Sequence, residues 1–310
     1  MINTYEQAAL RQSAERLVAS EWSEATKAVE AMTNDELFKE SVVHLKANPN
    51  DPSTPEYAKA LAGYAVDYCK IYGDGFSDKT EDEIILLAGA PNFFHLQNRI
   101  DDLEKEKRQQ SNRRLDKPQW EEYKQLKKEL VGYNQLLSDF IYNNPDGTMS
   151  DLNQALTEQA ITSFPKHAEQ LFSTITQETR GARTEAASRR LLDIAHVPYE
   201  RGTVYEDTRG GDIIIIFNNK RIKVDIKSSL DQIAKINDGY DDTYEHKKAY
   251  AISKSPRGRK TADDVIAIFP GFTDRDFGDS LNLQLDSATL QERSNMLAAQ
   301  LMRAIRELNV

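Results

Sequence analysis

The stretch that most constrains the fold runs from Gly210 to Ser229 and reads GGDIIIIFNNKRIKVDIKSS. Two short runs rich in β-branched residues, Ile213–Phe217 and Arg221–Ile226, flank the pair Asn218-Asn219. Runs of this composition favour strands, and asparagine tolerates the positive φ that a two-residue hairpin turn requires. The sequence therefore predicts an antiparallel β-hairpin that turns at the two asparagines.

The position of the turn fixes which side chains share a face. If Phe217 pairs with Lys220, the pairing continues outward until Asp212 lies opposite Asp225, with Cβ atoms about 5 Å apart. Lys227 lies two residues beyond Asp225 and points the same way. One face then carries two carboxylates and an amine at one end. The other face is apolar and consists of Ile213, Ile215, Ile222, Val224 and Ile226.

Two carboxylates at this separation repel each other. One of them is expected to have a raised pKa unless a cation lies between them. Mg²⁺ binds through one or two carboxylates and completes its coordination with waters and substrate phosphates. Asp212 and Asp225 are therefore candidate Mg²⁺ ligands. The alternative interpretation is a half-exposed sheet surface that carries an ordinary Asp–Lys pair.

This arrangement resembles the PD-(D/E)XK nuclease superfamily, which includes most type II restriction endonucleases. Its motif is an acidic residue near the start of one strand, followed on the next strand by Asp or Glu, any residue, and Lys. Here the motif corresponds to Asp212 and then Asp225-Ile226-Lys227, and the resemblance extends from about Glu178 to Pro270. Gly211 stands where a proline often precedes the first acid. The resemblance implies a Mg²⁺-dependent nuclease core.

The resemblance also implies roles for individual residues. The two aspartates hold the metal, and Lys227 orients or deprotonates the attacking water or stabilises charge on the phosphate. Many members add a glutamate from a preceding helix, and Glu185 in GARTEAASRRLLDIA has a suitable place. Glu200 and Glu206 are possible substitutes for it. Alternatively, Glu185 forms an ordinary i,i+4 pair with Arg189 on a helix surface.

Composition limits the other classes of function. The chain has 310 residues, a net charge of −10 and a single cysteine, Cys69, so no internal disulfide can form and a cytoplasmic location is predicted. No apolar run approaches the length of a membrane span. The five histidines show no zinc-ligand spacing. The acidic total argues against a pure nucleic-acid-binding module, although a nuclease needs only a basic cleft.

Three local basic clusters are candidate contacts for DNA phosphates, and solvated surface charge is the alternative for each. The first surrounds Glu185, the second lies in a later loop, and the third lies at the tip of a predicted helical hairpin. Their members are Arg180, Arg183, Arg189 and Arg190; then Lys254, Arg257, Arg259 and Lys260; then Lys107, Arg108, Arg113 and Arg114.

The first half of the chain, to about residue 172, is predicted to be helical. Apolar residues recur at three- and four-residue steps on both sides of a polar stretch within residues 92–142, which predicts an antiparallel helical hairpin with Pro118 opening its second helix. The hairpin packs within a helical domain, or it serves as a dimer contact or DNA clamp. The turn sequence NNPDG at 143–147 predicts a boundary between a helical region, 1–147, and a catalytic core, 148–310.

The second half mixes both kinds of element. Helices are predicted at Ser150–Gln159, Pro165–Gln177, Thr184–Ala195 and Ser287–Leu308, and further strands at Tyr199–Val204, Ala249–Ser253 and Val265–Phe269. Strands interspersed with helices, including a hairpin, indicate an α/β protein of the α+β kind with a mixed sheet flanked by helices.

The sequence thus favours a Mg²⁺-dependent endonuclease of the type II restriction kind that cuts double-stranded DNA at a specific sequence. A homodimer is expected, because cleavage of a duplex needs two sites. Two alternatives remain open. One is a structure-specific repair, recombination or phage nuclease of the same fold, and the other is a non-enzymatic helical interaction or scaffold protein.

Overall fold

A computed structural model describes residues 80–110, 114–161, 164–208, 211–218, 220–229, 250–253 and 265–307. The chain forms two compact units, Met1–Leu136 with Ala155–Phe172, and Leu137–Gln154 with Ser173–Val310. Helices α6 (Lys117–Asn143), α7 (Met149–Ile161) and α8 (Ala168–Ile194) contribute residues to both units. Whether residues 1–147 and 148–310 are separate domains stays a prediction.

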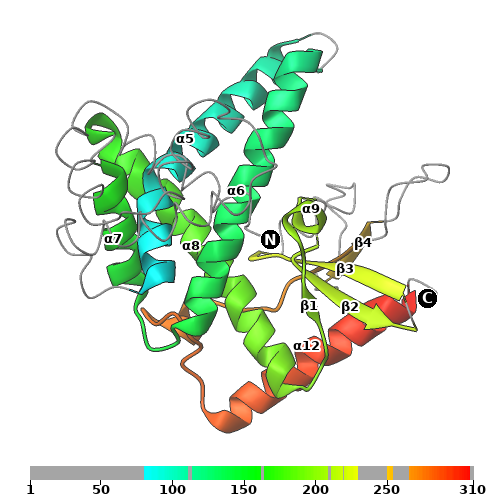
Figure 1. Ribbon diagram of the computed structural model, residues 1–310. Coiled ribbons are helices and arrows are strands. Elements are labelled where there is room, and N and C mark those ends of the chain that lie inside the picture. Colours follow the sequence, from blue (N-terminus) through cyan, green and yellow to red (C-terminus); the bar gives the residue numbers. More distant parts are fainter. Residues whose placement is uncertain are drawn as a thin grey trace, which may run out of the picture. The chain divides into compact units, whose positions relative to one another are not determined.

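The first unit contains the predicted helical hairpin, formed by α5 (Glu81–Gln109) and the first part of α6 (Figure 1). Thr80 begins α5 with a capping box, in which its hydroxyl accepts from the Glu83 N–H and the Glu83 carboxylate accepts from the Thr80 N–H. The two helices are joined by stacking of the Phe93 and Tyr133 rings, whose centroids lie 4.7 Å apart. The hairpin prediction is confirmed.

Two helices are longer than the sequence pattern predicted. The predicted hairpin begins at residue 92, whereas α5 begins at Glu81 and joins the segments before and after Pro91 in one helix. The predicted helices 165–177 and 184–195 are one helix, α8, which is preceded by the 3₁₀ turn Pro165–His167. In α5, residues buried on both sides of Pro91 hold the two segments together. In α8, Gly181 reduces helix propensity without preventing the helix.

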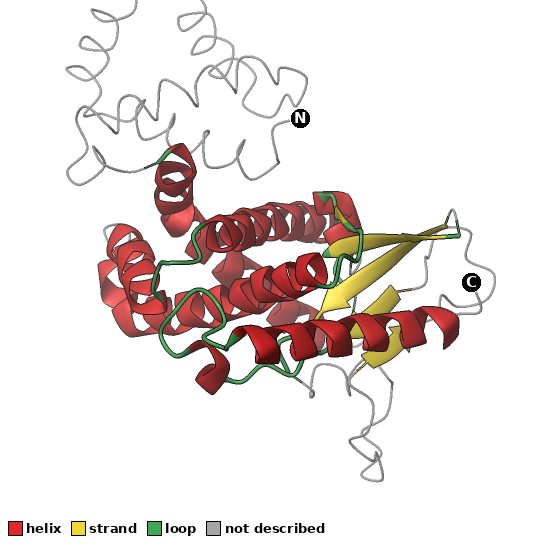
Figure 2. Ribbon diagram, turned by 90° about the horizontal axis from the view of Figure 1, so that it is seen from below, coloured by secondary structure: helices red, strands yellow, loops and turns green. Residues whose placement is uncertain are grey.

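The second unit contains a five-stranded mixed sheet in the order β1-β2-β3-β5-β4 (Figures 1 and 2). The strands are β1 (Glu200–Arg201), β2 (Ile213–Phe217), β3 (Lys220–Ile226), β4 (Tyr250–Ser253) and β5 (Val265–Ile268). Neighbouring strands pair antiparallel, except that β3 and β5 are parallel. The predicted mixed sheet among helices is therefore confirmed, and β5 is an internal strand between β3 and β4.

The β2–β3 hairpin has the predicted register. Phe217 pairs with Lys220 and Ile213 pairs with Val224. Asn218 adopts a positive φ of 50°, the left-handed conformation for which asparagine suits this turn.

The apolar face of this hairpin packs into the core of the second unit, against α8 and the closing helix α12 (Ser287–Glu307). Figures 1 and 2 both show α12 running beside the sheet. Ser294 of α12 is also buried, and its hydroxyl donates to the Leu191 carbonyl of α8. The residues predicted for this face belong to one buried apolar cluster. Its other members include Ile266 and Ile268 of β5, Leu191 of α8, and Leu297 and Leu301 of α12. This packing fixes the opposite, polar face of the hairpin.

Within the described ranges, no helix combines the length and apolarity needed to cross a membrane.

Candidate active site

The residues predicted to carry chemistry lie at one end of the β2–β3 hairpin. Asp212 directly precedes β2, Asp225 lies near the end of β3, and Lys227 follows β3. The Ile226 N–H donates to Asp212 Oδ2 at 2.6 Å, which holds the Asp212 side chain against β3. Lys227 Nζ lies 2.7 Å from Asp225 Oδ1. The structure therefore brings these three side chains together.

The local backbone is held by several contacts around Asp212. Its carbonyl accepts from the Gly202 N–H at 3.0 Å, immediately after β1. A side chain at position 202 would not fit there, because an added Cβ would lie 1.7 Å from the Gly211 carbonyl oxygen. A Cβ at Gly211 would in turn lie 3.0 Å from the Glu206 carbonyl oxygen. Glycine at these two positions allows the backbone segments to approach closely and places Asp212.

The pKa of Asp212 is raised well above the usual range of an aspartate. Burial of its carboxyl group is the largest cause, and the negative charges of Asp225 and Asp207 add to it. The Ile226 N–H and the Lys227 ammonium act in the opposite direction. The predicted repulsion between the paired carboxylates is therefore present, and the single lysine does not cancel it.

Asp207 was not identified as a site residue by the sequence. It lies at the end of the short helix α9 (Val204–Asp207), which begins with a capping box between Thr203 and Glu206. The sequence TVYED shows the capping box, which predicts the short helix. It does not show that the last residue of this helix faces Asp212.

Glu185 lies on α8, as predicted, but its carboxylate is already engaged. It forms an ion pair with Arg201 of β1, and its Oε1 also accepts from the Ser138 hydroxyl at 3.0 Å. The expected pair with Arg189 does not involve it, because Arg189 instead pairs with Asp139. Whether Glu185 contacts a metal stays a prediction.

The two possible substitutes for Glu185 are held by one arginine. Glu200 and Glu206 both form ion pairs with Arg221 of β3. Burial acts to raise the pKa of Glu206, but hydrogen bonds from Thr203 and Arg221 outweigh it and lower the pKa. Both carboxylates therefore have a cationic partner.

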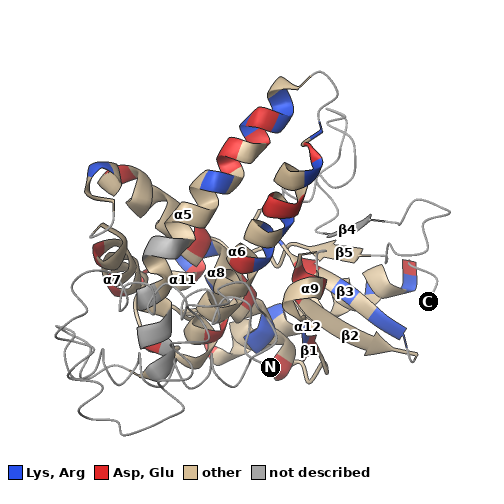
Figure 3. Cartoon of the chain, turned by 45° about the horizontal axis from the view of Figure 1, so that its top comes forward, with Lys and Arg blue, Asp and Glu red and all other residues tan. Residues whose placement is uncertain are grey.

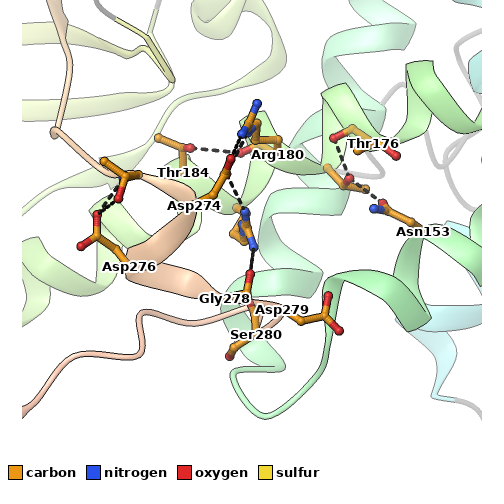
Figure 4. Close-up of polar contacts among 12 residues, drawn as sticks. Asn153, Thr176, Arg180, Thr184, Asp274, Asp276, Gly278, Asp279 and Ser280 are labelled. Carbon is orange, nitrogen blue, oxygen red and sulfur yellow. Dashed lines mark hydrogen bonds and ion pairs between the residues drawn. The ribbon is translucent and has the colours of Figure 1, made fainter.

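The basic cluster on α8 serves internal contacts. Arg180 pairs with Asp274 (Figure 4). Buried Arg183 lies over the Phe277 ring at 4.2 Å and donates to the carbonyls of Gly278 and Ser280. Arg190 donates to the carbonyls of Ile141 and Tyr142 at 2.6 and 2.7 Å. These arginines link α8 to the end of α6, to the short helix Asp274–Phe277 and to the loop that follows it, so the interpretation of this cluster as a phosphate-binding cleft is not supported.

The other predicted DNA contacts fall mostly outside the described residues. Lys254, Arg257, Arg259, Lys260 and Arg113 are among those outside, whereas Arg114 is described and exposed. Near it, Lys107 and Arg108 lie in the last turn of α5. Figure 3 shows acidic residues interspersed with basic ones along the helical hairpin of α5 and α6. Arg108, for example, forms an ion pair with Glu104.

The two carboxylates fit the requirements of Mg²⁺. Among the residues with described side chains, no group of three or more His, Cys, Asp or Glu is arranged to hold a metal ion. Mg²⁺ requires fewer protein ligands, because water and phosphate oxygens complete its coordination. Asp212 and Asp225 supply two carboxylates whose mutual repulsion a cation would relieve. Comparisons with family models, with curated proteins and with solved structures found no match for the chain.

Proposed function

We propose that the chain is a Mg²⁺-dependent DNA endonuclease of the PD-(D/E)XK kind. The observation that carries the proposal is the gathering of Asp212, Asp225 and Lys227 at one end of the hairpin. The Asp212 carboxylate accepts from the Ile226 N–H and interacts electrostatically with Asp225, and Lys227 Nζ lies 2.7 Å from Asp225 Oδ1. The order of elements along the chain also agrees with the resemblance. Helix α8, which carries Glu185, comes first, then β2, which follows Asp212, and then β3, which contains Asp225.

The chain's own residues would act as follows. Asp212 and Asp225 bind Mg²⁺, which when bound neutralises charge on the scissile phosphate and supports formation of the nucleophile. Lys227 is held beside the carboxylates by its pair with Asp225, and its ammonium orients the attacking water or balances charge on the phosphate. The side chain of Lys227 is 27% exposed and that of Asp225 is 14% exposed, so the lysine retains access to solvent for this role.

Double-stranded DNA is the proposed substrate, and sequence-specific cleavage by a homodimer is the proposed mode of action. Two copies are needed because one such site cuts one strand of a duplex. Cleavage of a long duplex of mixed sequence tests the mode of action. Discrete fragments indicate sequence-specific cutting, whereas preferential cleavage of branched or gapped substrates indicates the structure-specific alternative.

The proposal is tested with purified protein, supercoiled plasmid and Mg²⁺, with EDTA as the metal-free control. We expect nicking or linearisation only with Mg²⁺. Asp225→Asn is expected to lower cleavage by at least about 100-fold, because the metal supplies several kcal/mol of stabilisation to the transition state. Asp286→Asn is the matched control, since Asp286 only caps α12 through Thr289. Full cleavage by the Asp225 variant would overturn the assignment.

A further inference from the structure

Arg201 of β1 is the residue through which Asp212 is connected to the helices of its unit. Its Nη1 lies 3.4 Å from the Asp212 carbonyl oxygen, and the same nitrogen pairs with Glu185 Oε1. Its Nε lies 3.5 Å from Asp139 Oδ1. One guanidinium therefore contacts the backbone of Asp212, helix α8 and the end of helix α6.

The partners of this arginine are themselves held in place. Ser138 donates to Glu185, and Arg189 pairs with Asp139. The side chains of Arg201 and Glu185 are only 21% and 14% exposed. A planar guanidinium has donors in fixed directions, so it can contact a carboxylate and a carbonyl together, which a lysine ammonium on a flexible stem does less well.

We propose that Arg201 is a positioning residue for Asp212, and that Glu185 holds Arg201 instead of binding the metal. The proposal rests on the nuclease function proposed above. Glu185 orients the guanidinium, and the guanidinium together with the Gly202 N–H fixes the Asp212 carbonyl. This arrangement would hold the Asp212 carboxylate where it interacts with that of Asp225.

The proposal differs measurably from a role of Glu185 as a third metal ligand. A ligand is needed for metal affinity, so Glu185→Gln would raise the Mg²⁺ concentration at half-maximal effect by about 10-fold or more. In a positioning pair, Glu185→Gln and Arg201→Met shift that concentration to a similar extent, because both act through the same ligand, Asp212. Each also lowers kcat by about 10- to 100-fold with little effect on the KM for DNA, because misplacement of a reacting group has costs of this size.

The experiment combines cleavage kinetics with Mg²⁺ titrations, in which the thermal unfolding temperature is measured at each Mg²⁺ concentration. The variants are Glu185→Gln, Arg201→Met, their double variant, and Arg201→Lys as the conservative change. Arg221→Met is the matched control, because Arg221 forms two ion pairs on the same sheet through Glu200 and Glu206. Thermal unfolding also identifies any variant that does not fold.

We expect kcat of the double variant to equal that of the more impaired single variant, because both substitutions break the same contact between Glu185 and Arg201. Arg201→Lys should recover part of the activity. A Mg²⁺ midpoint that shifts at least 10-fold in Glu185→Gln but not in Arg201→Met would overturn the proposal, as would additive losses in the double variant. If the wild type does not cleave DNA, the nuclease function fails, and the Mg²⁺ midpoints from unfolding still decide the role of Glu185.

Discussion

Replacing Asp212 by asparagine is expected to make the metal-free protein more stable at neutral pH. Burial of the Asp212 carboxyl group, together with the negative charges of Asp225 and Asp207, raises its pKa. Asparagine removes the charge and keeps an oxygen that accepts the Ile226 N–H. Its amide group can also donate to Asp225.

The expected size follows from Coulomb's law at about 5 Å, the usual Cβ separation of directly opposed residues in a hairpin. Two unit charges about 5 Å apart interact by about 3 kcal/mol at an effective dielectric constant of about 20. Lys227, at 2.7 Å from Asp225, offsets part of this repulsion. The net gain in free energy of unfolding for Asp212→Asn is therefore expected to be about 1 to 3 kcal/mol at pH 7 without metal.

The pH dependence provides an internal check. Because the folded-state pKa of Asp212 is raised, the folded protein binds more protons than the unfolded chain between the two pKa values. The contribution of Asp212 to the free energy of unfolding is fully present below its pKa in the unfolded chain. It is lost as the pH rises through its pKa in the folded protein. The variant lacks this loss, so the difference between the two proteins should vanish in acid and grow toward neutral pH.

Urea unfolding across this pH range, with and without Mg²⁺, measures both effects. At Mg²⁺ ten times above its Kd, the wild type should gain about 1.4 kcal/mol, and Asp212→Asn should gain much less. Asp286→Asn is the control of opposite sign, because hydrogen bonds from Thr289 lower the pKa of Asp286. A metal-free Asp212→Asn protein less stable than wild type at pH 7 would refute the argument of carboxylate repulsion.

The remaining predictions concern the backbone near the site and the lysine. Gly202→Ala should cost about 2 kcal/mol or more by thermal unfolding, because its Cβ would lie 1.7 Å from the Gly211 carbonyl oxygen. Gly181→Ala in α8 should instead add about 0.5 to 1 kcal/mol, since nothing lies within 4 Å of the new Cβ, and a loss there would contradict the helix assignment. Lys227→Met should lower plasmid cleavage by about 100-fold or more while DNA binding in a gel-shift assay persists; retained cleavage would exclude a role for the amine in the reaction.

The register of the β2–β3 hairpin was predictable because it depends on local properties. Alternating side chains have a period of two, and the turn at Asn218 sets the pairing of every residue that follows. From this alone, Asp212, Asp225 and Lys227 fall on one face. The helical hairpin was predictable for a similar reason, since its three- and four-residue apolar spacing identifies the buried stripe of each helix.

The partners of charged side chains were decided by tertiary structure. Glu185 meets Arg201, 16 positions later in the chain, only because α8 packs beside β1, and a helical pattern offers Arg189 as an equally good neighbour. Arg190 of α8 contacts carbonyls at the end of α6 and in a loop, about 50 and 90 residues away in the chain. No local period encodes such contacts. Asp212, Asp225 and Lys227 of the candidate site could therefore be placed on one face from the sequence, whereas Asp207 and the contacts that hold Asp212 in place required the packed structure.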